Sequence, residues 1–220
     1  MTYGEFKDRR ILITGASKGL GSVCAKNFAN LGARVVIAGR NLGTLEELKA
    51  SLLHPERHML FVGDLVDQQV IGKLIRQGTE FFGGFDILLH VVGGGYGFHD
   101  PLLSWEQFDL LHKVNVSIAA EINRLVLPEM VKAKSGRVIH VGSISSQEAT
   151  ASVGYNTVKA SLAAYVRSLG RELAHTGVVI CGVLPGAFYA PGNSWERLEA
   201  NKPEVVERFI ESNLPRKKIA

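Results

Sequence analysis

The 220-residue sequence has few of the features that are typical of secreted or membrane-bound proteins. It contains two cysteines, Cys24 and Cys181, both in apolar stretches, which indicates reduced buried thiols and no disulfide framework. No apolar run approaches the roughly 18 residues of a membrane helix. Residues 1–10 carry charges of both signs and lack the hydrophobic stretch of a signal peptide. These absences predict a cytoplasmic protein without a membrane partner.

An excess of charge of one sign is also nearly absent. The chain has 25 Lys and Arg against 21 Asp and Glu, a formal net charge of +4. The basic residues are scattered and cluster only at 216–218, so we expect no nucleic-acid partner. We assign no metal site, because a chain of this length buries enough apolar surface to fold without one. The mildly basic balance suits an enzyme that binds a phosphorylated cofactor.

What is present is a regular alternation of β-branched runs and longer amphipathic segments. Most of the runs are continuously apolar, which is typical of strands buried on both faces. Six strands are predicted, over residues 11–14, 34–38, 58–63, 87–92, 137–141 and 178–184. Regular βαβ alternation implies a parallel sheet with right-handed crossovers and helices on both faces. We therefore predict an α/β fold of the Rossmann type, a doubly wound three-layer sheet in one domain over residues 1–220.

The segments between the strands predict the helices. A helical spacing of apolar residues covers 22–31, and Thr44 with Glu47 matches a capping box in which Thr44 is the cap. Two long helices are expected over residues 105–134 and 152–175.

A glycine-rich turn follows the first predicted strand and opens the first predicted helix. Its glycines, Gly15, Gly19 and Gly21, allow a sharp turn that brings backbone N–H groups and a helix N-terminus close to a pyrophosphate. A glycine-rich pattern alone is weak, but its position between strand and helix predicts dinucleotide binding.

Tyr155 and Lys159 stand four residues apart in a predicted helix, so their side chains project from one face. A phenol titrates near pH 10, too high for ready acid/base work at neutral pH. A fixed ammonium nearby favours the phenolate and lowers that pKa. The same spacing also occurs by chance in purely structural helices, so the pair needs support from other motifs.

Together these motifs resemble the short-chain dehydrogenase/reductase family, whose signature begins Thr-Gly-x-x-x-Gly-x-Gly. The glycine spacing is similar to that of the compact single-domain subtype. The resemblance covers residues 10 to about 219. It implies an oxidoreductase that interconverts a carbonyl and a secondary alcohol by hydride transfer, with Tyr155 as the acid/base.

The cofactor type depends on the end of the second strand. Gly39 stands where a carboxylate commonly repels a 2′-phosphate. Arg40 and Lys18 are candidates for binding that phosphate, the alternative being two solvated surface cations. We therefore predict NADP(H) over NAD(H). Asp64 closes the third strand; the resemblance implies that it contacts the adenine amino group, and the alternative is a helix N-cap near Val66.

The residues expected around the cofactor come from six segments of the chain. They are Gly15, Ser17, Lys18, Gly19, Leu20, Gly21, Arg40, Asn41, Asp64, Leu65, Gly93, Tyr155, Lys159, Pro185, Gly186 and Phe188.

The resemblance also implies the remaining catalytic roles. Ser143, at the carboxyl end of a predicted strand, would hydrogen-bond the substrate carbonyl. Ser145 and Ser146 are rivals by composition but lie further into the loop. Asn115 would hold a water that links Lys159 to solvent, and Lys159 would also hold the ribose. Without that role, an Asn in the middle of a helix usually faces solvent.

Three departures from the family pattern stand out. His90-Val91-Val92-Gly93 replaces the usual Asn-Asn-Ala-Gly, and His90 is either a hydrogen-bonded structural histidine or a functional one. Ala190 stands near where a Thr commonly holds the nicotinamide carboxamide. Residues 213–219 resemble the start of a closing section that normally adds one more helix and strand. Either this copy is truncated or the given chain omits that section; if it is truncated, the sixth strand is expected at the sheet edge.

Three loops are expected to enclose a small carbonyl or alcohol substrate: residues 93–99, the segment after 143, and a lid at about 187–212. By the resemblance, the helices over 105–134 and 152–175 would join a homodimer or homotetramer. Two rival hypotheses stay open. One is other chemistry on the same scaffold; the other is a catalytically silent NADP-binding regulator or scaffold protein.

Overall fold

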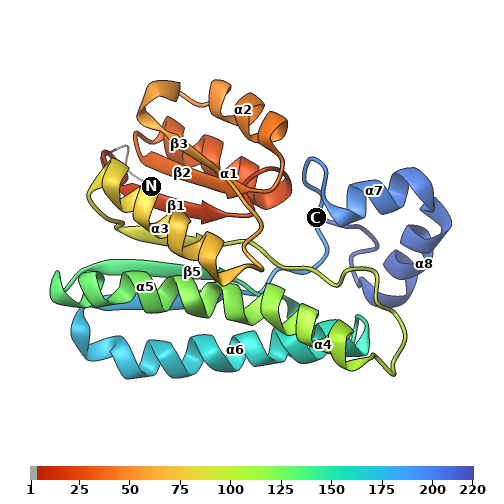
Figure 1. Cartoon of the computed structure of the whole chain (residues 1–220). Helices are drawn as coiled ribbons and strands as arrows, with labels where there is room; N and C mark the ends of the chain where they lie inside the picture. The colour runs from red at the N-terminus through yellow and green to blue at the C-terminus, as the bar shows by residue number, and fades with distance from the viewer. Residues whose placement is uncertain (1–3) are drawn as a thin grey trace.

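Six parallel strands form the centre of the molecule, in the order β3-β2-β1-β4-β5-β6 (Figure 1). The computed structural model describes residues 4–220. The first three residues of segment 1–10, in which no signal peptide is expected, lie outside the described part. The strands are β1 Arg10–Thr14, β2 Arg34–Gly39, β3 Met59–Val62, β4 Ile87–His90, β5 Gly136–Val141 and β6 Val178–Val183. The predicted doubly wound fold is confirmed.

The central strands are buried on both faces, which is why they read as unbroken apolar runs. Ile11, Leu12 and Ile13 of β1 are all 0% exposed. Successive side chains of a strand point to opposite faces. Leu12 accordingly packs in the core on one side of the sheet, and Ile11 and Ile13 pack in the core on the other.

Helices cover both faces and complete the three layers. Helices α1 and α2 lie on one side, while α3, α5 and α6 lie on the other (Figure 1). The helices are α1 Gly19–Asn30, α2 Leu42–Ala50, α3 Gln68–Phe82, α4 Trp105–His112, α5 Ile118–Lys132, α6 Val153–Leu173, α7 Ser194–Asn201 and α8 Pro203–Asn213. None of the helices within residues 4–220 is long and apolar enough to cross a membrane.

Two predictions about the helices are wrong. Asn41 caps α2, not Thr44: the Asn41 Oδ1 accepts from the Thr44 N–H at 2.9 Å, because the helix begins three residues earlier than the capping-box pattern places it. The single helix expected over 105–134 is interrupted by a π-helical turn, Lys113–Ser117, between α4 and α5. Such turns insert one extra residue and are frequent at functional sites.

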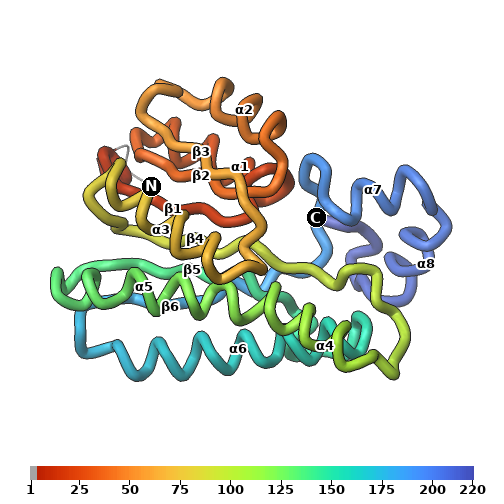
Figure 2. Tube along the Cα trace, viewed as in Figure 1, coloured from red at the N-terminus to blue at the C-terminus, as the bar shows by residue number. Residues whose placement is uncertain are grey.

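The segment after β6 forms a separate lobe beside the carboxyl ends of the strands (Figure 2). Helices α7 and α8 pack on each other, with the Trp195 and Phe209 rings 4.5 Å apart. Strand β6 is the outermost strand on its side of the described sheet, and the side chains of Val179 and Val183 are about half exposed.

Candidate active site

The glycine-rich loop between β1 and α1 has the geometry that a pyrophosphate cradle requires. Gly15 and Gly19 have φ of +65° and +58°, a region that side chains disfavour. A Cβ on Gly21 would lie 2.4 Å from the Gly15 carbonyl oxygen. Only glycine therefore fits this turn, and the N-terminus of α1 opens directly behind it. A dinucleotide pyrophosphate fits the residues present.

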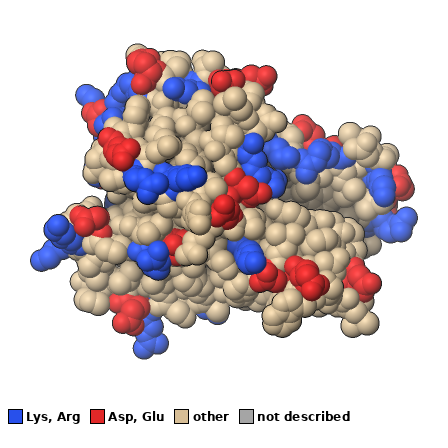
Figure 3. Space-filling view, in the orientation of Figure 1, with Lys and Arg blue, Asp and Glu red and all other residues tan. Residues whose placement is uncertain are grey.

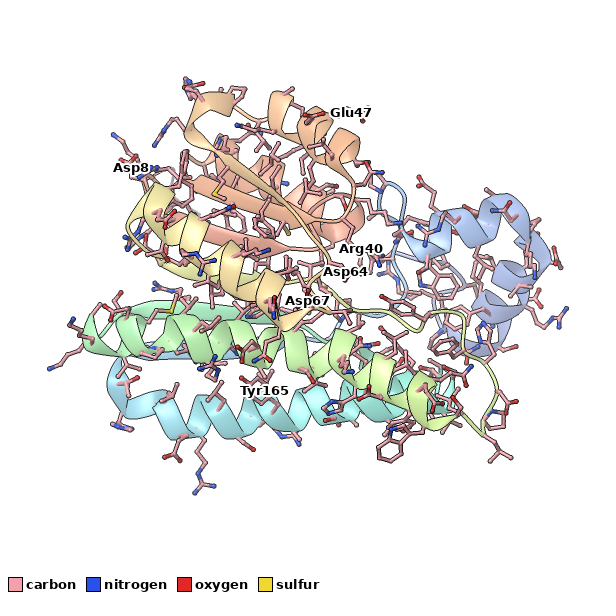
Figure 4. All side chains as sticks on the ribbon, viewed as in Figure 1. Asp8, Arg40, Glu47, Asp64, Asp67 and Tyr165 are labelled. Carbon is pink, nitrogen blue, oxygen red and sulfur yellow. The ribbon has the colours of Figure 1, made fainter. Side chains whose placement is uncertain are left out.

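The expected adenosine end lies beside this loop, where β2 and β3 end. The Arg40 guanidinium lies 3.9 Å from the Asp64 carboxylate, and both side chains are more than half exposed. Both residues project from the carboxyl edge of the sheet (Figure 4). In Figure 3, basic side chains gather with acidic ones where the main body meets the α7–α8 lobe. A Cβ at Gly39 would lie 3.2 Å from the Ser17 hydroxyl, so a larger side chain would crowd this corner.

The predicted cofactor residues next to Arg40 make contacts that stabilise the local fold. Asp64 does not cap α3, as the alternative had it; its Oδ1 accepts from the Val66 N–H at 3.1 Å, and Asp67 caps the helix. Leu65 is buried in the core and is 4% exposed. The Asn41 carboxamide oxygen is engaged by Thr44.

The segment after β6 touches the glycine-rich loop. The Gly19 N–H donates to the Pro191 carbonyl at 2.7 Å, and a Cβ at Gly192 would lie 3.5 Å from the Lys18 Cβ. The predicted cofactor residues of this segment are close by: the Pro185 carbonyl accepts from the Ile144 N–H, and the Phe188 carbonyl accepts from the Asn193 side chain. The start of the predicted lid therefore lies against the predicted pyrophosphate loop.

Three of the predicted catalytic and cofactor residues converge on one point. A Cβ built on Gly93 would lie 2.9 Å from the Asn115 Oδ1 and 3.1 Å from the Lys159 Nζ. Asn115 is 2% exposed and lies in the π-helical turn, where its carboxamide bonds both the N–H and the carbonyl of Gly94. The solvent-facing alternative for Asn115 is therefore wrong.

Lys159 is buried at the same place. Its side chain is 3% exposed, and its Nζ donates to the Val141 carbonyl at 3.0 Å. Burial lowers the pKa of this ammonium to about 8. The Nζ lies 5.6 Å from the centre of the Tyr155 ring. A buried amine with a perturbed pKa, held beside a phenol, is typical of a functional site.

Tyr155 lies in the first turns of α6, beside Ser143 at the end of β5. Burial raises the pKa of the phenol, and a hydrogen bond with the Ser143 hydroxyl opposes that rise. Of the two rival serines, Ser145 lies near Thr150, and the Ser146 hydroxyl is buried without a partner among the described residues. Ser143 is therefore the serine that the structure hydrogen-bonds to Tyr155.

A buried polar cluster beneath these residues was missed by the sequence analysis, except for His90. The His90 Nε2 donates to the Asn123 Oδ1 at 2.9 Å, and the Asn123 Nδ2 donates to the Tyr165 hydroxyl at 3.0 Å. That nitrogen also faces the His140 Nε2 at 3.4 Å. The two imidazoles stack with ring centres 4.6 Å apart. His90 is thus hydrogen-bonded within the core. Apart from His90, a sequence signal for this cluster was Asn123, a polar residue on an apolar helix face.

Both imidazoles are held neutral. Burial lowers the pKa of His90 to about 4, and burial together with His90 and Lys159 lowers that of His140 to about 2. The Nδ1 atoms of both rings are buried without partners in the described chain, so added protons would find no acceptor.

This burial predicts acid lability. Between pH 6.5 and the lowered folded-state pKa values, the unfolded chain binds protons that the folded chain does not. The free energy of unfolding is therefore complete above pH 6.5 and should fall by about 1.4 kcal/mol per pH unit for each such histidine below it. Urea unfolding at pH 7 and pH 4.5 measures the loss. A double variant, His90→Asn with His140→Asn, should show a shallower pH dependence; an unchanged slope would contradict the assignment.

Comparison with known proteins identifies the chain. The family model described as short chain dehydrogenase matches residues 9–201. The chain belongs to the short-chain dehydrogenase/reductase family. An uncharacterised oxidoreductase of Staphylococcus epidermidis is 30% identical over 188 residues, 85% of this chain and 81% of the relative. One from Staphylococcus aureus is 29% identical over 208 residues, with 92% and 90% covered.

Solved structures of other short-chain dehydrogenases share the fold. The L-sorbose reductase of Gluconobacter frateurii, complexed with NADPH and L-sorbose, superposes with a TM-score of 0.88 at 24% identity. The superposition covers 100% of this chain and 87% of the reductase chain. Levodione reductase gives a TM-score of 0.85 at 26% identity, with 98% and 86% covered. This short-chain dehydrogenase is therefore an oxidoreductase with a Rossmann-type fold.

Proposed function

We propose that this protein is an NADP(H)-dependent reductase or dehydrogenase that interconverts a carbonyl and a secondary alcohol, with Tyr155 as the acid/base. The observation that carries the proposal is the convergence of Asn115 and Lys159 at Gly93, with Tyr155 and Ser143 beside them. Four polar groups held together at the carboxyl edge of a parallel sheet favour a catalytic site over a chance pattern.

Each residue has a defined role in this proposal. A bound NADP(H) would supply the hydride chemistry. In the reducing direction the Tyr155 hydroxyl donates its proton to the carbonyl oxygen, while the Ser143 hydroxyl hydrogen-bonds that oxygen and stabilises the charge growing on it. Lys159 binds the ribose, and its positive charge stabilises the phenolate that remains on Tyr155 after the proton transfer. Asn115 holds a water on the path that returns a proton to Lys159.

The environment of the Tyr155 phenol explains why a positive charge is needed beside it. Burial alone raises the pKa of Tyr155 and so disfavours its ionised form. A buried cation within reach is the standard compensation, and the Lys159 ammonium is the one that the fold brings to the ring. The proposal therefore includes a lowering of the Tyr155 pKa by the Lys159 ammonium.

A panel of carbonyl compounds, followed by the loss of NADPH absorbance, tests the activity. Turnover of at least one class of carbonyl supports the reductase. The rival hypothesis of a catalytically silent NADP-binding protein gains support if NADPH binds tightly and no member of a broad panel is reduced. The lid proposed at about 187–212 would set which carbonyl enters.

Preference for NADP(H) rests on Arg40, whose exposed guanidinium stands at the end of β2 with no acid at Gly39. The L-sorbose reductase of Gluconobacter frateurii was solved with NADPH, and a 3-oxoacyl (acyl-carrier-protein) reductase of Agrobacterium tumefaciens, with a TM-score of 0.87 at 23% identity, was solved with NADP; both support the proposal by analogy of fold. Position 39 carries no carboxylate to repel a 2′-phosphate, and Arg40 offers a planar cation there, with the Asp64 carboxylate 3.9 Å away on β3's side of the corner.

We expect Arg40→Asp to weaken NADPH binding by roughly 10- to 100-fold, the worth of a lost hydrogen bond between charged groups, and to leave NADH binding nearly unchanged. Arg76→Asp is the matched control, because Arg76 is exposed on α3 and makes the same change in net charge. Fluorescence titration with both cofactors measures the effect. Equal NADPH affinity in the two variants would refute the assignment.

We propose further that copies of the chain associate through the surface of α4, α5 and α6. Trp105, at the start of α4, is 84% exposed, and the neighbouring Leu102 is 87% exposed. Large apolar side chains so exposed are typical of an interaction site. A monomeric mass in sedimentation equilibrium would contradict this proposal.

A further inference from the structure

The buried cluster of His90, Asn123, His140 and Tyr165 takes one residue from each of four elements: β4, α5, β5 and α6. The proposed site draws on the same four parts of the chain. Gly93 follows β4, Asn115 precedes α5, Ser143 follows β5, and Tyr155 and Lys159 lie on α6. The cluster therefore connects every element that carries a proposed catalytic group.

The spacing along each element is nearly equal. In the strands, His90 and His140 each stand three residues before a site residue, which is ~10 Å of extended chain. In the helices, which run the opposite way, Asn123 follows Asn115 by eight residues and Tyr165 follows Lys159 by six, which is ~9–12 Å of helix. The cluster is thus one layer lying at an even depth below the site, and Tyr165 is at the α5–α6 contact in Figure 4.

One covalent step joins this layer to Lys159. His140 directly precedes Val141, whose carbonyl accepts the hydrogen bond from the Lys159 Nζ. The partner in register on the next strand is His90, and the two rings stack. Asn123 then ties the pair of strands to Tyr165 on the helix that carries Lys159. The carbonyl and the ammonium are thereby held to each other through side chains on both of their elements.

We propose that His90, Asn123, His140 and Tyr165 act as a positioning unit that holds the Lys159 ammonium on the Val141 carbonyl. The titratable groups that face His140 are His90, Tyr165 and Lys159. The His140 imidazole is therefore neutral, because a second positive charge beside the buried Lys159 ammonium is disfavoured. The proposal rests on the proposed function for the task of Lys159. The contact between the Lys159 ammonium and the Val141 carbonyl can be tested without measuring enzyme turnover.

The test is the pKa of Lys159, measured by NMR on lysine-labelled protein, with Lys159→Gln to assign the signal. In His140→Leu the β5 segment loses its tie to Asn123, water reaches the ammonium, and the pKa of Lys159 should rise by about one unit or more toward its ordinary value. The matched control is His58→Leu. His58 is as buried as His140, and its ring bonds the Val35 N–H and the Leu53 carbonyl near the amino ends of β2 and β3.

A rise in His140→Leu with no change in His58→Leu supports the positioning unit. Equal values in the two variants, at similar losses of stability, overturn it and leave the cluster as packing only. If His140→Leu does not fold, Tyr165→Phe removes only the hydroxyl that Asn123 bonds and should raise the pKa of Lys159 in the same direction; an unchanged value there overturns the proposal as well. Either result is obtained whether or not a carbonyl substrate has been found, so failure of the proposed function is seen separately.

Discussion

Tyr155→Phe is expected to lower turnover by roughly 10²- to 10⁴-fold, the contribution typical of a positioned acid/base group. The substitution removes one oxygen and keeps the ring, so the packing of α6 should be retained. NADPH affinity should change little, since the glycine-rich loop and Arg40 lie apart from the phenol. Single-turnover kinetics with the best carbonyl of the panel, together with NADPH titration, would measure both effects.

The matched control is Thr157→Val, which also removes a hydroxyl from α6. The Thr157 Oγ1 donates to the Val153 carbonyl within the same helix and is exposed. This variant should keep full turnover. Residual activity of Tyr155→Phe above about a tenth of the wild type would rule out proton transfer by Tyr155, because a lost acid/base group costs more than that.

The phenol also shows the limit of argument from spacing. Tyr155 and Lys159 at four residues predict a shared helix face, and the structure has both on α6. The predicted lowering of the phenol pKa does not follow from this spacing alone, because burial raises it in the folded chain. Burial depends on what packs around the ring, and no local pattern contains that information.

Strands and the glycine-rich turn were predictable because their causes are local. Ile11–Ile13 form an apolar run of the kind typical of a strand buried on both faces, and the close approach at Gly21 excludes any other residue. The interruption at Lys113–Ser117 was not predictable, since no Gly or Pro marks it. The pairing of His90 with His140 depends on strand register, which joins residues fifty positions apart.

Gly93→Ala should have the second large effect, and its cause is purely steric. The added methyl would lie 2.9 Å from the Asn115 Oδ1 and 3.1 Å from the Lys159 Nζ, so at least one of these two side chains must shift away from its hydrogen-bond partner on the backbone. Displacement of catalytic groups by about 1 Å can cost roughly 100-fold. We therefore expect kcat/KM to fall by about that factor.

Backbone effects can be separated from this clash by a second glycine. Gly72, inside α3, has nothing within 4 Å of an added Cβ, so Gly72→Ala should raise the free energy of unfolding by about 0.5–1 kcal/mol and keep full activity. Gly93 is not among the residues with positive φ, so alanine there costs no backbone strain. A loss of activity confined to Gly93→Ala would then report the crowding of Asn115 and Lys159. Full activity in both variants would mean that the convergence of these two side chains at Gly93 does not carry the chemistry.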